Sequence, residues 1–118
     1  MNPDTNLAHN LAQFKQYSPV AQRGFILART NCLSMYELCM VADNLDVFIE
    51  FCDEAHKIAM HRDHYSARTI VEVMRHHSTI RGAGKQFKIS NNITPLMAKL
   101  SMDMFPMLNG LFSTRRGK

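Results

Sequence analysis

The sequence predicts a mainly α-helical domain with one short two-stranded β element in its C-terminal half. Helix starts are indicated by Ser18-Pro19 and Thr94-Pro95, because the hydroxyl accepts first-turn amide hydrogens and proline has no amide hydrogen to leave unpaired. The β element is indicated by the alternation at Phe87-Lys88-Ile89 and by the Asn109-Gly110 turn, which would bring residues 111–114 back beside it.

The size and composition of the chain are those of one globular domain. Its 118 residues suffice for a single core, and the apolar fraction of 46% and charged fraction of 20% are typical of soluble proteins. No apolar run is long enough to span a membrane, and the N-terminus lacks the basic and apolar regions of a secretory signal. The three cysteines form no CxxC pair, so we expect reduced core thiols and a cytoplasmic protein.

Residues 1–61 are expected to form a helical scaffold. Ser34 with Glu37 three residues later is a capping box, and Asp43 or Asn44 offers a further cap unless the helix bends and continues. Helices are predicted over residues 5–16, 19–29, 35 onward and 43–61. The last of these has a mostly acidic outer face, and its inward stripe comprises Leu45, Phe48, Ile49, Cys52, Ala55 and Ala59.

Residues 62–118 are expected to form a helix-strand-helix-strand unit. Its first helix follows Ser66 over residues 67–77, and its second spans Thr94–Met104 before Phe105-Pro106 ends it. The inward residues of the first helix are Ala67, Ile70, Val71, Met74 and His77. This order also allows a winged-helix-like arrangement, in which the second helix would enter a nucleic-acid groove.

Positive charge is concentrated in this second unit. Residues 1–60 contain four Lys or Arg and seven Asp or Glu, a net charge of −3, whereas residues 61–118 contain ten and three, a net charge of +7. Such asymmetry indicates a polyanion or an acidic protein surface as the partner of the C-terminal half.

Ten side chains are the candidate nucleic-acid contacts, with DNA as the expected polymer. The expected phosphate contacts are Arg68, Arg75, Arg81, Lys85, Lys88, Lys99, Arg115 and Arg116. Asn91 and Asn92 are available to bases or sugars. The alternative is that residues 90–92 are only a polar loop before a helix cap, and that residues 115–116 are a solubilising chain end.

A helix-turn-helix is a weaker candidate at Gly24–Asp43. Leu33, Leu38 and Val41 have the offsets of apolar anchors in such a unit. However, Cys32 stands where glycine is usual, and the second helix has acidic residues but no Lys or Arg to contact phosphates. A structural helical hairpin is the preferred interpretation.

The sequence contains no pattern that indicates catalysis or metal binding. His56, His61 and His64 lie close together, but their spacing matches no helical ligand pair and no HExxH motif occurs. Phosphate-binding glycine loops, GxSxG motifs and paired carboxylates on an apolar face are also missing from the sequence. We therefore expect a protein that is not an enzyme and that uses no metal or cofactor.

Short motifs between residues 44 and 116 carry a resemblance to a known family. They are NLDVFIEF at 44–51, YSARTI at 65–70, FKISNN at 87–92, Pro95, Ala98-Lys99, Pro106, Phe112 and Arg115. Through these motifs the segment resembles a family of small phage and prophage proteins, although relatives commonly have Asn-Pro at Asn44-Leu45 and Ala-Arg at Ala98-Lys99. The resemblance implies a phage or mobile-element origin and a location in the host cytoplasm, but no particular activity.

Two functions follow as expectations. The first is a non-enzymatic regulatory protein that binds nucleic acid through its basic C-terminal half. The alternative is an inhibitor or adaptor that binds a host defence or transcription complex, with Met102 and Phe105 in the contact. Nine methionines are many for this length, and adaptable thioethers suit partner surfaces.

Overall fold

Six α-helices and a short 3-10 turn make up the regular structure in the computed structural model, which describes residues 11–81 and 92–112 (the side chains of 77–81 excepted). The elements are α2 (Leu11–Gln16), α3 (Pro19–Leu27), α4 (Met35–Ala42), α5 (Leu45–Ala59), α6 (Ala67–Arg81), α7 (Thr94–Met104) and η1 (Pro106–Leu108). The mainly helical expectation is confirmed, and the second helix of the C-terminal unit has the predicted bounds.

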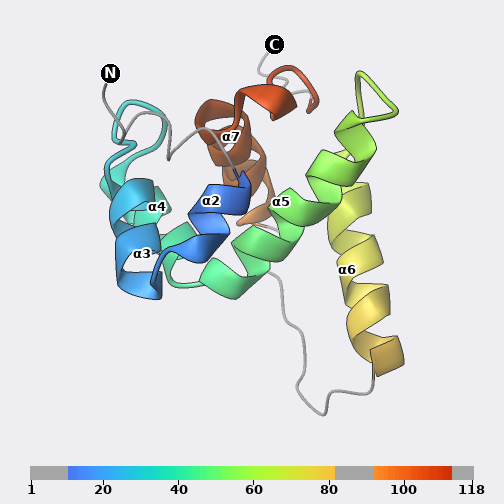
Figure 1. Cartoon of the computed structure of the whole chain (residues 1–118), viewed down its shortest axis with the longest axis horizontal. Helices are drawn as coiled ribbons and strands as arrows, with labels where there is room; N and C mark the ends of the chain where they lie inside the picture. The colour runs from blue at the N-terminus through green and yellow to red at the C-terminus, as the bar shows by residue number, and fades with distance from the viewer. Residues whose placement is uncertain (1–10, 82–91, 113–118) are drawn as a thin grey trace.

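Helix α5 is the centre of the fold. It runs diagonally between α2, α3 and α4 on one side and α6 on the other, and it contacts α2, α4, α6, α7 and η1 (Figure 1). Phe48, Cys52 and Ala55 of its predicted stripe are buried, and Phe51 is buried as well. Leu45, Ile49 and Ala59 are only half-buried, so the buried face is turned toward Phe51 relative to the predicted stripe.

The caps predicted at Ser18 and Ser34 are present, whereas α7 begins at Thr94 without the side-chain cap that was expected there. Ser18 accepts a hydrogen bond from the amide of Ala21 at 3.2 Å. Ser34 accepts one from the amide of Glu37 at 3.2 Å, while the Glu37 carboxylate accepts one from the amide of Ser34 at 3.0 Å. Both arrangements satisfy amides that the first helical turn leaves without a partner.

The junction between α4 and α5 is stabilised by hydrogen bonds other than the cap predicted at Asp43 or Asn44. Asn44 does precede α5, but its side chain makes no capping hydrogen bond there. Its amide nitrogen instead donates to the carbonyl of Met40 at 2.8 Å, and Arg23 donates to the carbonyl of Ala42 at 3.0 Å. These side chains satisfy carbonyls at the end of α4, so the chain turns between two separate helices.

The predicted β element is wrong in the part that the structure describes. Phe112 forms an isolated parallel bridge with Tyr65, and residues 11–81 and 92–112 contain no strand; residues 87–89 lie outside that range. Leu111 and Phe112 are both buried, whereas a half-exposed strand would bury only one of two neighbours. Gly110, with φ of +83°, turns this pair into the core.

The first helix of the C-terminal unit is longer than predicted. Helix α6 continues to Arg81, whereas the spacing of apolar residues indicated an end near residue 77. Ile70, Val71 and Met74 are buried as expected. The helix therefore extends beyond its apolar pattern, up to the residue before Gly82, the next strong helix breaker in the sequence.

Candidate functional site: a basic edge and a groove

Every Lys and Arg within residues 1–60 lies against a carboxylate. The pairs are Lys15–Asp53 at 2.9 Å, Arg23–Asp43 at 3.0 Å, Arg29–Asp103 at 3.5 Å and Lys57–Glu54 at 3.5 Å. Three of them join different parts of the chain, and the fourth lies within α5. The positive charge of the N-terminal half is therefore matched by carboxylates of the protein itself.

The cations of the C-terminal half are placed differently. Among the described residues, Arg62, Arg68 and Lys99 form no salt bridge. The Arg62 guanidinium lies over the Tyr65 ring, 5.8 Å from its centroid, and Arg68 and Lys99 are exposed. Their charge is available to an anionic ligand.

The ten predicted nucleic-acid contacts fall into three groups. Arg68 and Arg75 lie seven residues apart on α6 and therefore on one face of that helix, with Arg75 half-buried. Asn92 is exposed just before α7, and Lys99 is exposed on α7. The side chains of Arg81, Lys85, Lys88, Asn91, Arg115 and Arg116 lie outside the described residues. In the described part, α6 carries the arginines and α7 carries the lysine.

Helix α7 is a poor candidate for the helix that enters a groove. Five of its residues are buried: Met97, Ala98, Leu100, Ser101 and Met104. It contacts α4, α5, α6 and η1, and its exposed face, with Pro95, Lys99 and Asp103, holds one cation and one carboxylate. Because the described residues contain no strand, they show no winged-helix arrangement around Thr94–Met104, whereas α6 at the edge of the molecule leaves one face exposed (Figure 1).

The connection between α5 and α6 forms a compact basic edge. Met60, His61, Arg62, His64 and Arg68 are all exposed there. The amide of Tyr65 donates a hydrogen bond of 2.9 Å to the carbonyl of Leu111, which fixes the end of the described C-terminal segment to this connection. The Arg62–Tyr65 cation–π contact was not predicted from the sequence, although an arginine three residues before a tyrosine is a usable signal.

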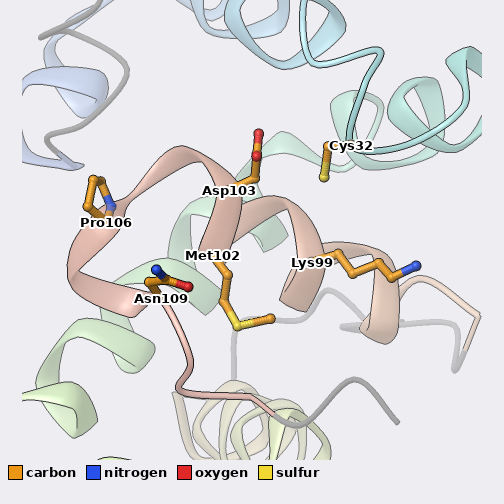
Figure 2. Close-up of a pocket in the computed structure, with 6 residues that line it drawn as sticks. All are labelled: Cys32, Lys99, Met102, Asp103, Pro106 and Asn109. Carbon is orange, nitrogen blue, oxygen red and sulfur yellow. The ribbon is translucent and has the colours of Figure 1, made fainter. Parts of the chain in front are cut away.

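A shallow groove of about 550 Å³ lies along the outer face of α7 (Figure 2). It is lined by Cys32, Lys99, Met102, Asp103, Pro106 and Asn109. The Arg29–Asp103 ion pair joins the connection between α3 and α4 to α7 beside it. Lys99 and Met102, predicted for two different functions, thus lie in the same groove.

The thiol in this groove is a weak nucleophile at neutral pH. Burial raises the pKa of the Cys32 thiol, and the Asp103 carboxylate raises it further, although Lys99 and Arg29 act in the opposite direction. Burial also raises the pKa of the Cys52 thiol, which has no access to solvent. Neither environment stabilises a thiolate, which is the reactive form of cysteine.

Phe105 is a core residue, so its predicted place in a partner contact is wrong. It is fully buried, with its ring 5.9 Å from that of Phe14 and 5.7 Å from that of His56. Met97, Ser101 and Phe105 follow one another at intervals of four residues and all are buried, so the helical spacing contained this information. Met102 remains half-exposed at the groove.

The segment Gly24–Asp43 forms a helical hairpin rather than a helix-turn-helix. Helices α3 and α4 pack together, but residues 28–34 connect them, which is longer than the three- or four-residue turn of that motif. Arg23 pairs with Asp43 across the hairpin at 3.0 Å. The exposed part of α4 presents Met35 and Tyr36.

Within residues 11–81 and 92–112, no three metal-ligating side chains converge, and no helix has the length and hydrophobicity to cross a membrane. The Nδ1 atom of His56 lies 2.8 Å from the carbonyl oxygen of Cys52, at the border of the core.

Comparison with known proteins yields no guide to function. No protein-family model, curated protein or solved structure matches this chain. The resemblance of residues 44–116 to phage and prophage proteins therefore stays a prediction.

Proposed function

We propose that this protein binds nucleic acid through the cations of its C-terminal half and acts as a regulator rather than as an enzyme. One observation supports this above all others. All four cations of residues 1–60 form salt bridges with carboxylates, whereas Arg62, Arg68 and Lys99 form none in the described part of the chain. Phosphates of a nucleic acid are the complementary ligand for such cations.

The exposed face of α6 and the connection before it are the most suitable surface. Ile70, Val71 and Met74 hold α6 against the core, and Arg68 is exposed beside this buried face. The described chain ends beside Tyr65, and its sequence continues through Arg115 and Arg116. DNA is the polymer that we propose.

The salt dependence of binding tests this proposal. Fluorescence anisotropy with a labelled oligonucleotide should show affinity falling steeply as salt rises, because each phosphate contact releases a counterion. Arg68→Gln should weaken binding and reduce the slope of log K against log salt by about one. Lys57→Gln removes the same charge from an existing ion pair and should leave that slope unchanged. Binding that is insensitive to salt would contradict the proposal.

A second candidate is the protein-binding inhibitor or adaptor. The groove beside Met102 favours it, as does the exposed Met107 next to Pro106 on the groove's edge. If the resemblance to phage proteins holds, the partner is a host complex. Retention of a stoichiometric host protein after nuclease treatment, and its loss in Met102→Lys but not in Met60→Lys, would favour this function over nucleic-acid binding.

A further inference from the structure

We infer that the α5–α6 connection, residues 60–66, is a site for unpaired bases, so that the nucleic acid taken by this protein is single-stranded. The inference rests on the proposed function and goes further, because phosphate contacts alone do not distinguish a single strand from a duplex. Base faces are accessible for stacking on a protein only when the strand is unpaired.

The first observation is a cation–π contact in the connection. The Arg62 guanidinium lies over the Tyr65 ring at 5.8 Å, and the Tyr65 side chain is half-exposed. Guanidinium planes and aromatic rings are the two protein surfaces on which bases stack. Arg62 thus presents both a flat face and a positive charge at one place.

The second observation is the exposure of Met60. Met60 is 69% exposed, and the polar residues His61 and Arg62 follow it in the sequence. An exposed thioether gains nothing from phosphates, but it packs well against the faces of bases. The imidazole rings of His61 and His64 are exposed beside it and add further flat surface.

The third observation is that this connection is firmly held. The Tyr65 amide donates to the Leu111 carbonyl at 2.9 Å, and the neighbouring Phe112 packs on Phe51 with ring centroids 5.4 Å apart. Ser66 accepts a hydrogen bond from the Thr69 amide at 3.3 Å and so fixes the start of α6. A site already ordered in the free protein loses little entropy when the ligand binds.

The charge and the accessibility of the α5–α6 connection also suit a nucleic-acid strand. Arg62 and Arg68 lie on either side of Tyr65 in the sequence, and Asp63 is the acidic residue between them. The connection projects at the end of α5, clear of α2, α3 and α4, so a strand can approach it (Figure 1). Phosphates would contact the arginines while one or two bases lie against Tyr65 and Met60.

The test compares labelled twelve-nucleotide oligo(dT) with a duplex of the same length at one low salt concentration. The wild-type protein should bind the single strand at least ten-fold more tightly. Tyr65→Leu removes the ring but keeps apolar volume, and Arg62→Lys keeps the charge but removes the plane. Each should weaken single-strand binding about five-fold or more and leave duplex binding unchanged, whereas Tyr65→Phe should bind like the wild type.

A crosslink in the unaltered protein avoids any effect of substitution on folding. Oligonucleotides containing 5-bromodeoxyuridine should crosslink under ultraviolet light to the tryptic peptide of residues 63–68, which contains Tyr65. Crosslinks only outside residues 58–68, or equal affinity for single strand and duplex, would overturn the inference and leave the proposed function standing. Absence of salt-dependent binding to either oligonucleotide would overturn both.

Discussion

Tyr65 and Phe112 form a parallel backbone bridge that joins the start of α6 to the end of the described chain. The Phe112 ring is buried against Phe51 of α5, at a centroid distance of 5.4 Å. Two segments that are distant in the sequence are thereby held at one edge of the molecule. The same contact supports the fold and orders the proposed site.

Removal of this aromatic contact should destabilise the protein strongly. Phe112→Ala removes a nearly fully buried ring, and such changes cost about 3–5 kcal/mol because they leave a cavity. Urea denaturation followed by circular dichroism measures the loss. Met107→Ala, at a residue 54% exposed, is the matched control and should change stability by less than about 0.5 kcal/mol. Equal losses for both variants would contradict the role assigned to Phe112.

A buried amide gives a second prediction. Gln22 is 4% exposed, and its Nε2 atom donates a hydrogen bond of 2.8 Å to the carbonyl of Phe14. The same carbonyl also accepts from the Tyr17 amide at 3.2 Å, so Gln22→Ala removes one of its two donors and should cost about 0.5–1.5 kcal/mol. Gln16→Ala on the exposed surface is the control. If thermal unfolding shows the two variants to be equally stable, water can replace the amide and the prediction is wrong.

The capping box at the start of α4 gives a third prediction. Ser34→Ala removes the oxygen that accepts from the Glu37 amide and should destabilise the protein by about 1 kcal/mol. Ser34→Thr keeps an acceptor in the same place and should restore most of the loss. A Thr variant as unstable as the Ala variant would show that the hydroxyl acts in some other way.

Features determined by neighbouring residues could be predicted from the sequence, and features determined by distant contacts could not. Ser34 and Glu37 are three residues apart, so their capping box is visible in the sequence. The bridge of Tyr65 with Phe112 depends on packing across the fold, which no local pattern specifies. Phe105 combines a local and a distant feature. Its helical spacing from Met97 and Ser101 indicates an inward position, but its burial also depends on the distant Phe14.

The candidate site follows the same division. The excess of cations in the second half is a property of composition and can be counted directly in the sequence. That Arg23 and Arg29 are engaged by Asp43 and Asp103 required the fold, because the paired residues are far apart in sequence. The contrast between engaged and available cations, which supports the proposed function, therefore comes from the structure alone.

The buried thiol of α5 should make stability fall at alkaline pH. Burial raises the pKa of Cys52 well above the ordinary value of 9.0, to which it returns in the unfolded chain. The native state therefore holds the proton more tightly, and the resulting stability is complete below pH 9 and is lost as pH rises toward the folded-state pKa.

Denaturation at several pH values measures this effect. Between pH 9 and pH 10 the free energy of unfolding should fall by about 1 kcal/mol through Cys52 alone. Cys52→Ala lowers stability at every pH by leaving a small cavity, but its free energy of unfolding should decline less steeply over that interval. The remaining titrating groups are common to both proteins, so the difference between the two slopes isolates the thiol. Parallel curves would mean that Cys52 ionises as readily in the folded protein as in the unfolded chain.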